Sequence, residues 1–580
     1  MPQCYRRMKR RKAEKLMRIT NLHIENFRSI QDLTLCPSQI TALVGPNNAG
    51  KSNILLAIQK VIGRDWLSVG QFDESDVYGL DNNRDVTIEL SFDPALEYLK
   101  FVKANPVRIR TLNFTYTRYK IGEKAGQRRL EQKCFDANGR PPMVPVKAPQ
   151  KDGENKLQPL VNIPQEVRES IPLIYIGTNR SLQNHLPSAR YSLLRQLFED
   201  INRDFHDPSH IVKVKQADGK TKDIPKSEWF NTLMTKIMNL LRTDAFVKLE
   251  TDIKCNALQQ LGFDPDVDTD KLDFFFSPFD TMDFYKTLEL KVREHGYEIN
   301  ATELGEGFQN AIVLSILQAF EENKKKGAIL LIEEPEMFLH PQMQRTLYKT
   351  LRKIGETNQI IYTTHSPQFV TVPEYNDILV IRKDEEGTHA VPSSLPTNAK
   401  RKEKLIKELD PERNEMFFAT RLLLVEGDTE KLALPEYAKR LGIDLDRKGS
   451  SIVEVGGKRN LPEFADIASS FGIPTGILYD IDSSEIQDTD EEEEFNEALN
   501  ERETDDGSVK VWCFKNKYED SLKKALGEKA YQGLCQKYPK IGKPTRARLI
   551  AMEEGLSIPK PIEEILNWLV DIELIDIDDD

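Results

Sequence analysis

The sequence predicts an α/β protein with two successive parallel-sheet domains. Apolar runs of strand length alternate with runs of helical periodicity from residue 17 onward, and the alternation resumes at about residue 417. Such alternation is typical of β-α-β units. Between the two series lies the polar, proline-punctuated stretch VPSSLPTNAKRKEKLIKELDPERN, where we place the main domain boundary.

The composition is that of a soluble globular chain. Of 580 residues, 39% are hydrophobic and 30% are charged, and no apolar run approaches the roughly 20 residues that span a bilayer. The net charge of -12 means that nucleic-acid binding would depend on local basic patches or on metal ions. The six cysteines are far apart and form no C-x-x-C pair, which argues against a zinc ribbon or a disulfide framework and favours a reducing, cytoplasmic location.

Four stretches follow one another along the chain. Residues 1–16 read as a basic arm, or as the product of a start upstream of Met17; residues 17–395 contain the first α/β domain. Residues 396–416 are the linker, and residues 417–580 form the second α/β domain. Each of the two α/β domains contains one of the candidate sites described below.

A helical insertion is expected within the first domain, at about 188–270. The segments YSLLRQLFEDI and WFNTLMTKIMNLLRTDAF have helical periodicity. The stretch between Lys51 and Glu333 has no sustained heptad seam, which argues against a long coiled-coil arm. We therefore expect the insertion to mediate self-association.

The segment GPNNAGKS matches the phosphate-binding pattern G-x-x-x-x-G-K-[ST]. It follows the apolar strand ITALV and opens the helix SNILLAIQKVIG, which is the context that this pattern requires. Backbone N–H groups would cradle the phosphates, the lysine would reach the β- and γ-phosphates, and the serine would bind Mg²⁺. The predicted ATP-binding residues are Gly45, Asn47, Asn48, Gly50, Lys51 and Ser52.

Two later strands end in groups that complete an ATPase site. In AILLIEEPE, the apolar strand ends with Glu333, which is suited to binding Mg²⁺ through water, and Glu334, which is suited to orienting the attacking water. The strand of QIIYTTHSP ends at His365, which would reach the γ-phosphate. Their order and spacing favour a catalytic role over surface acids and a structural histidine.

Together with IENFRSI and ELGEGFQN, these segments resemble the ABC-type P-loop ATPase head of the SMC and RecF group. Heads of that group dimerise head to tail, so the resemblance implies that Gly305 and Gly307 form the signature loop facing the partner's nucleotide. The expected serine is absent, and Glu306 stands in or beside its place. Because a carboxylate repels a triphosphate, we expect weak hydrolysis and ATP acting mainly as a bound signal.

The second domain has acids at two strand ends. Glu426 follows RLLLV, with Glu430 four residues later across a helix start, and GILYDID ends in Asp480 and Asp482. Crowded carboxylates at the carboxyl ends of an α/β sheet predict divalent metal, and two shared metals suit phosphodiester cleavage. The acids from Asp488 to Glu494 we interpret as solvated surface.

The motifs E-G-x-x-E and D-x-D resemble the Toprim domain. An ABC head followed by Toprim on one chain resembles the OLD (overcoming lysogenisation defect) nuclease family, which includes the Gabija nuclease subunit. The resemblance implies that Glu426, Glu430, Asp480 and Asp482 bind metal. It also implies that Glu519 is a later metal ligand and that Lys543 steadies charge on the cleaved phosphate.

We therefore predict a nucleotide-regulated endonuclease that uses Mg²⁺, or Mn²⁺, to nick or cut DNA. The resemblance implies anti-phage defence, a homo-oligomer (dimer or tetramer) formed through the ATPase domain, and a second defence subunit or a regulatory nucleic acid as partner. Two alternatives stay open: a RecF- or SMC-like ATP-dependent DNA clamp without nuclease activity, and an RNA-processing Toprim nuclease.

Overall fold

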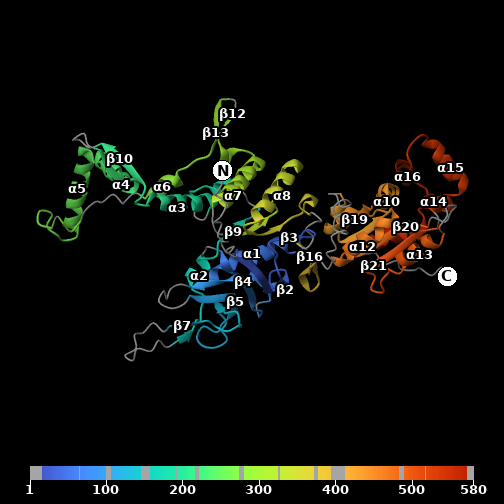
Figure 1. Ribbon diagram of the computed structural model, residues 1–580, viewed down its shortest axis with the longest axis horizontal. Helices are drawn as coiled ribbons and strands as arrows, with labels where there is room; N and C mark the ends of the chain where they lie inside the picture. Colours follow the sequence, from blue (N-terminus) through green and yellow to red (C-terminus); the bar gives the residue numbers. More distant parts are fainter. Residues whose placement is uncertain are drawn as a thin grey trace, which may run out of the picture. The chain divides into compact units, whose positions relative to one another are not determined.

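The computed structural model describes residues 16–63, 66–81, 83–98, 106–145, 157–178, 181–189, 192–215, 221–268, 270–272, 280–294, 296–323, 327–370, 377–392, 412–481, 489–515 and 517–570. Nearly all of the predicted basic arm, most of the predicted linker and Asp482 lie outside these residues. The chain divides into two compact units: Met1–Thr178 with Lys326–Asp580, and Asn179–Lys325. The prediction of an α/β fold is confirmed (Figure 1).

A six-stranded sheet forms the core of the first predicted domain. The three strands that carry the nucleotide motifs, β3, β14 and β15, are buried along their whole length, as expected for parallel strands covered on both faces. Only β16 and β17 pair antiparallel. The order is β17 (Gly387–Pro392), β16 (Ile378–Asp384), β3 (Ile40–Val44), β15 (Gln359–Thr363), β14 (Ile329–Glu333) and β9 (Leu173–Ile176).

A second, antiparallel sheet contains the segment IENFRSI, so the first strand-like run after residue 17 does not belong to the predicted parallel sheet. Its strands alternate between buried and more exposed residues, because one face packs on the core. Helix α1 (Lys51–Ile62) contacts β1 and β4 of this sheet and β14 and β15 of the parallel sheet. The order is β2 (Ile30–Leu35), β1 (Arg18–Phe27), β4 (Val86–Tyr98), β5 (Val107–Arg118) and β6 (Arg128–Phe135).

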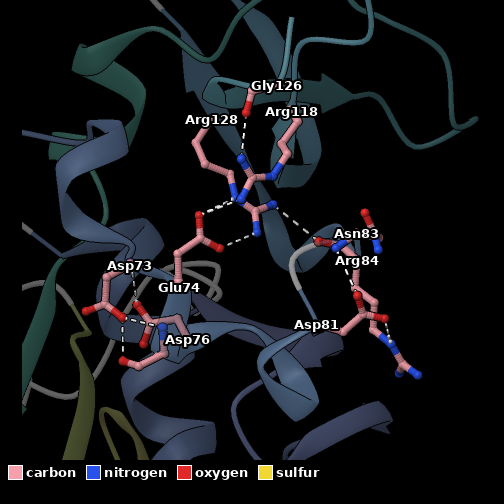
Figure 2. A network of polar contacts seen from close by, with 10 residues as sticks. Asp73, Glu74, Asp76, Asp81, Asn83, Arg84, Arg118, Gly126 and Arg128 are labelled. Carbon is pink, nitrogen blue, oxygen red and sulfur yellow. Dashed lines mark hydrogen bonds and ion pairs between the residues drawn. The ribbon is translucent and has the colours of Figure 1, made fainter.

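Polar contacts attach the short helix η2 (Glu74–Asp76) to this antiparallel sheet (Figure 2). Glu74 accepts hydrogen bonds from Arg118 of β5 and Arg128 of β6, each at 2.7 Å. The fully buried Asp76 accepts from Arg28 Nε at 2.8 Å and from Lys60 Nζ at 2.6 Å. Because Lys60 belongs to α1, Asp76 holds the helix that follows the phosphate loop.

The unit Asn179–Lys325 is mainly helical. The periodicity within 188–270 correctly indicated helices, but that stretch also contains the hairpin of β10 (Ile211–Lys215) and β11 (Thr221–Pro225). A second hairpin joins β12 (Lys291–Glu294) to β13 (Tyr297–Asn300). The helices are α3 (Leu193–Phe205), α4 (Lys226–Leu241), α5 (Asp244–Gln260), α6 (Thr281–Lys286) and α7 (Glu306–Asn323).

The C-terminal part, orange to red in Figure 1, has a four-stranded sheet that is parallel throughout. The order is β19 (Ser450–Glu454), β18 (Arg421–Val425), β20 (Thr475–Asp480) and β21 (Val509–Phe514). The first strand in sequence thus lies between the second and third, an arrangement that opens a crevice at the carboxyl ends of the strands. The helices are α10 (Asp428–Arg440), α11 (Leu445–Lys448), α12 (Leu461–Ser470), α13 (Thr489–Asn500), α14 (Tyr518–Leu526), α15 (Glu528–Lys537), α16 (Lys543–Met552) and α17 (Lys560–Leu569).

Helix α8 (Pro341–Gly355) connects β14 to β15 and contacts β15. The remaining α-helix and strands are short: α2 (Gln165–Glu169), β7 (Met143–Pro145) and β8 (Leu157–Pro159). Within the described part of the chain, we find no helix whose length and apolarity would let it span a bilayer. The five described cysteines are free: Cys36, Cys134, Cys255, Cys513 and Cys535.

Candidate functional site

The phosphate loop between β3 and α1 has no room for side chains at its two key glycines. Gly45 has φ +145°, and a Cβ there would lie 2.1 Å from the carbonyl oxygen of Ile381. Gly50 has φ +99°, and its Cβ would lie 2.2 Å from Thr388 Oγ1. Packing therefore requires glycine at both positions. The remaining predicted loop residues are solvent-exposed: Asn47, Asn48 and Ser52.

Lys51 is buried at the start of α1 and turns back onto the loop. Its Nζ donates to the carbonyl oxygens of Gly45 at 2.9 Å and Pro46 at 2.8 Å. Burial lowers the pKa of Lys51 to about 8, although the carboxylates of Glu334 and Glu336 favour its charged form. A phosphate would restore a full charge partner to this ammonium.

Glu333 ends β14 as a buried residue. Tyr175 of the neighbouring strand β9 donates its hydroxyl hydrogen bond to Glu333 Oε1 at 3.0 Å. Burial and the Glu333 carboxylate together raise the pKa of Tyr175, so the tyrosine stays a donor at every physiological pH. The sequence analysis missed Tyr175, which orients the predicted metal-binding carboxylate.

Glu334 and His365 lie side by side at the ends of β14 and β15. The Glu334 N–H donates to the Thr363 carbonyl oxygen at 3.0 Å, and Glu334 Oε1 lies 3.6 Å from His365 Nε2. Burial, followed by the charge of Lys51, lowers the pKa of His365, while Glu334 raises it. The structure thus brings together Lys51, Glu334 and His365, and their catalytic roles stay predictions.

Glu336 is a second residue that the sequence analysis missed. Its Oε1 accepts three hydrogen bonds from the segment after β15: Thr364 Oγ1 at 2.8 Å, the His365 N–H at 2.7 Å and the Ser366 N–H at 3.1 Å. Its Oε2 is buried and has no hydrogen-bond partner. Burial raises the pKa of Glu336. The only sequence signal was a third acid two residues beyond Glu334, in IEEPE.

Gly305 and Gly307 belong to the unit Asn179–Lys325 and are described within it. Gly305 precedes α7 and would have open space around a Cβ, whereas Gly307 lies in the first turn of α7. The Gln309 side chain donates to the carbonyl oxygens of Thr302 at 3.0 Å and Leu304 at 2.7 Å. This amide holds the loop that the sequence analysis assigned to the signature.

In the C-terminal part, Glu426 and Asp480 meet at neighbouring strand ends. Glu426 Oε1 accepts a hydrogen bond from the Asp480 backbone N–H at 2.7 Å. The Glu426 carbonyl oxygen accepts from the Gly457 N–H at 2.8 Å, which brings in the loop after β19. Three strands therefore deliver their carboxyl ends to one place, as parallel α/β sheets do.

Glu430 lies in the first turn of α10 and is 8% exposed. Burial, with smaller contributions from the carboxylates of Glu426 and Glu519, raises its pKa to about 7. Lys543 Nζ lies 3.7 Å from Glu519 Oε1. The structure thus places Glu430 near both Glu426 and Glu519, and Lys543 beside Glu519, whereas Asp482 lies outside the described residues.

These carboxylates suit a hard divalent cation, because oxygen ligands are what Mg²⁺ and Mn²⁺ prefer. Burial and the neighbouring carboxylates raise the pKa of Glu430, and a bound cation would lower this pKa again by stabilising the ionised carboxylate. Among the described residues, however, no three His, Cys, Asp or Glu side chains converge as a metal-binding group. The ligand set therefore stays a prediction.

Glu492 departs from the expectation of a solvated acidic run. It belongs to α13, its side chain is only 28% exposed, and it forms ion pairs with Lys458 and Arg459 of the loop after β19. Neither basic residue was singled out from the sequence, although both follow the pair Gly456–Gly457 at a strand end.

Comparisons with known proteins match both parts of the chain. A family model for the AAA ATPase domain matches residues 17–370, and a model for the overcoming lysogenization defect protein-like TOPRIM domain matches residues 417–482. An OLD nuclease of Thermus scotoductus is 29% identical over 572 residues, which cover 94% of this chain and all of that protein.

Two further relatives are more distant. The Old nuclease of Escherichia phage P2 is 27% identical over 502 residues, covering 80% of this chain and 77% of that protein. Endonuclease GajA of Bacillus cereus strain VD045 is 21% identical over 454 residues, covering 76% and 71%. The predictions of an ATPase domain and a Toprim domain on one chain are confirmed.

Proposed function

Because this chain belongs to the OLD family, with an AAA ATPase domain followed by a Toprim domain, we propose that it is a nucleotide-regulated, divalent-metal-dependent DNA endonuclease. The hydrogen bond between the Asp480 N–H and the Glu426 carboxylate carries the proposal, since it brings two predicted metal ligands from separate strands together. The names of the relatives, OLD nuclease and Endonuclease GajA, support the reaction class.

Each Toprim residue has a role in this proposal. Glu426, Glu430, Asp480, Asp482 and Glu519 would hold Mg²⁺ or Mn²⁺, which supplies a hydroxide and neutralises the leaving oxygen. Glu426 is oriented by its hydrogen bond to the Asp480 backbone. Lys543, 3.7 Å from Glu519, would place positive charge beside the cleaved phosphate.

Nucleotide would act at the first domain. Lys51 and the backbone of its loop would hold the phosphates, Ser52 and Glu333 would bind Mg²⁺, and Glu334 and His365 would face the γ-phosphate. The lowered pKa of His365 favours a neutral ring, which can accept or donate a hydrogen bond there. Glu306 at the start of α7 stays the reason to expect slow hydrolysis.

The helical insertion would mediate dimerisation or tetramerisation. Helices α4 and α5 expose several large apolar side chains, and an exposed apolar surface is a common mark of a protein interface. These side chains are Leu233, Ile237, Leu240, Leu241, Val247, Leu249 and Ile253. A role in anti-phage defence, and with it a second defence subunit or a regulatory nucleic acid as partner, is part of the proposal through the resemblance to the OLD family alone.

A supercoiled-plasmid assay with Mg²⁺ or Mn²⁺, with and without ATP, tests the proposal. We expect nicked or linear plasmid from the wild type, no cutting by Glu426→Ala, and cutting by Lys51→Ala that no longer responds to ATP. Glu503→Ala, an exposed acid of the same domain, serves as the charge-matched control and should cut normally.

The alternatives give different results in this assay. ATP-dependent DNA binding with no cutting under any cation would identify a clamp, and cleavage of RNA with intact DNA would identify an RNA-processing enzyme. ATP that suppresses cutting would mean an inhibitory gate, and cutting that requires ATP would mean a permissive one.

A further inference from the structure

Two basic residues lie next to the Toprim carboxylates and have no role in the proposed reaction. Lys458 and Arg459 form the short helix η9 (Lys458–Asn460) directly after β19. The Lys458 side chain is only 7% exposed, whereas that of Arg459 is 61% exposed. A buried lysine is costly unless it is paired, so its position requires an explanation.

Contacts with two backbone carbonyl groups hold Lys458 and Arg459 at the strand ends that carry Glu426 and Asp480. Lys458 Nζ donates to the carbonyl oxygen of Asp480 at 2.8 Å. The preceding residue, Gly457, donates its N–H to the carbonyl oxygen of Glu426 at 2.8 Å. The ammonium of Lys458 is therefore held between the strand ends that carry the two predicted metal ligands.

One carboxylate bridges both basic groups. Glu492 Oε1 lies 3.1 Å from Lys458 Nζ, and Glu492 Oε2 accepts a hydrogen bond from Arg459 Nη2 at 2.6 Å. A phosphate of a DNA backbone can bind a lysine and an arginine in the same way, with one oxygen on each cation. Its neighbours on α13, Glu491, Glu493 and Glu494, are exposed.

We infer that Lys458 and Arg459 bind a backbone phosphate of the DNA, next to the phosphate that the carboxylates act on, and that Glu492 occupies this phosphate position in the free protein. The inference rests on the proposed function, because it requires DNA as the ligand. Glu492 then acts as a built-in competitor, and DNA binding exchanges one anion for another on the same two cations.

The test measures binding of a short fluorescent DNA duplex to the full chain in Ca²⁺, which commonly supports binding without cutting. Glu492→Gln should tighten the Kd by about threefold to tenfold, since it removes the carboxylate charge that DNA must displace from both Lys458 and Arg459. Glu494→Gln makes the same charge change at an exposed position and should change the Kd less than twofold.

Arg459→Ala completes the cycle. It should weaken binding, lower the salt dependence by about one phosphate contact, and reduce the gain from Glu492→Gln in the double variant, since only Lys458 then still exchanges Glu492 for phosphate. Because Arg459 is exposed, its loss should leave folding intact even if a Lys458 variant does not fold.

The outcomes separate this inference from the proposed function. A wild type that binds and cuts DNA, with Glu492→Gln no tighter than Glu494→Gln, overturns only the competitor role and its phosphate site. The same holds if the gain is undiminished in the Arg459→Ala background. A wild type that binds no DNA overturns the proposed function and this inference together.

Discussion

The Glu336 carboxylate accepts a hydrogen bond from the backbone N–H of His365 at 2.7 Å, and so joins the end of β14 to the histidine that is predicted to reach the γ-phosphate. The same oxygen also accepts from Thr364 Oγ1 and the Ser366 N–H. One buried carboxylate thus holds three consecutive donors of the segment after β15. We therefore predict that Glu336 is a positioning residue, which would act on the nucleotide through His365.

Glu336→Ala should therefore slow the chemical step more than it weakens nucleotide binding. Without the acceptor, the His365 N–H loses its hydrogen-bond partner, at about 1–3 kcal/mol, and His365 loses its fixed position, whereas the Ser366 N–H keeps Thr364 Oγ1 as an acceptor. We expect single-turnover ATP hydrolysis to fall about tenfold or more while the nucleotide Kd changes less than threefold. Glu336→Gln should restore part of the rate, since its amide oxygen still accepts.

The matched control for Glu336 is Glu356→Ala, an exposed acid at the end of α8. It should hydrolyse ATP at the wild-type rate. Equal losses of rate and of nucleotide affinity in Glu336→Ala would indicate general damage to the site and contradict a positioning role.

Tyr175→Phe should weaken the use of Mg²⁺ at the nucleotide site. The variant removes the hydroxyl that donates to Glu333 at 3.0 Å and leaves a buried carboxylate oxygen without that donor. Loss of such an orienting partner typically costs 10- to 100-fold in metal affinity. A Mg²⁺ titration of ATP hydrolysis should show a higher half-saturating concentration.

The control for Tyr175→Phe is Tyr479→Phe, on β20 of the C-terminal sheet. This variant loses a tyrosine hydroxyl that donates to Asn500 of α13, away from the nucleotide motifs. Its Mg²⁺ titration at the nucleotide site should match the wild type. An unchanged titration in Tyr175→Phe would mean that Glu333 needs no help from the neighbouring strand.

The sequence predicted the parts of the fold that local patterns determine. The sequence indicated five buried strands because each is an apolar run followed by a motif: β3, β14, β15, β18 and β20. The motif residues Lys51, Glu334 and His365 lie close together in the structure. Glu426 and Asp480 meet for the same reason, since parallel strands share one carboxyl edge.

The contacts between segments that are distant in the sequence could not be predicted. IENFRSI pairs antiparallel with β4, some 60 residues away in the register of Ile24 with Ile88, and nothing local specifies that partner. Tyr175 reaches Glu333 because β9 lies beside β14, and Glu492 reaches Lys458 across the sheet end. Such contacts follow from strand order, which one sequence does not reveal.

Gly45→Ala should abolish the nucleotide site through packing. The new Cβ would lie 2.1 Å from the backbone carbonyl oxygen of Ile381, which cannot move as a side chain would, and φ +145° adds strain. We expect a destabilisation of about 2 kcal/mol or more and loss of ATP binding in a fluorescent-nucleotide titration. Gly70→Ala, with no neighbour closer than 3.7 Å, should bind ATP normally.

Stability without metal should fall as pH rises, because of Glu430. Its folded-state pKa of about 7 lies above the ordinary 4.5, so the folded state holds a proton that the unfolded state releases between those values. The folded state therefore loses up to about 3 kcal/mol as pH rises through this window. In EDTA, Glu430→Gln should raise the thermal midpoint at pH 8 and leave it nearly unchanged at pH 4.5.

Added Mg²⁺ should reverse the effect in the wild type at pH 8, because a cation stabilises the ionised carboxylate. In Glu430→Gln the Mg²⁺-induced rise should be smaller, since one predicted ligand is neutral. Glu463→Gln, on α12 of the same domain, controls for the change of charge. Equal midpoints for wild type and Glu430→Gln at pH 8 in EDTA would show that the buried carboxyl carries no ionisation penalty, and the electrostatic argument for a cation at this position would be lost.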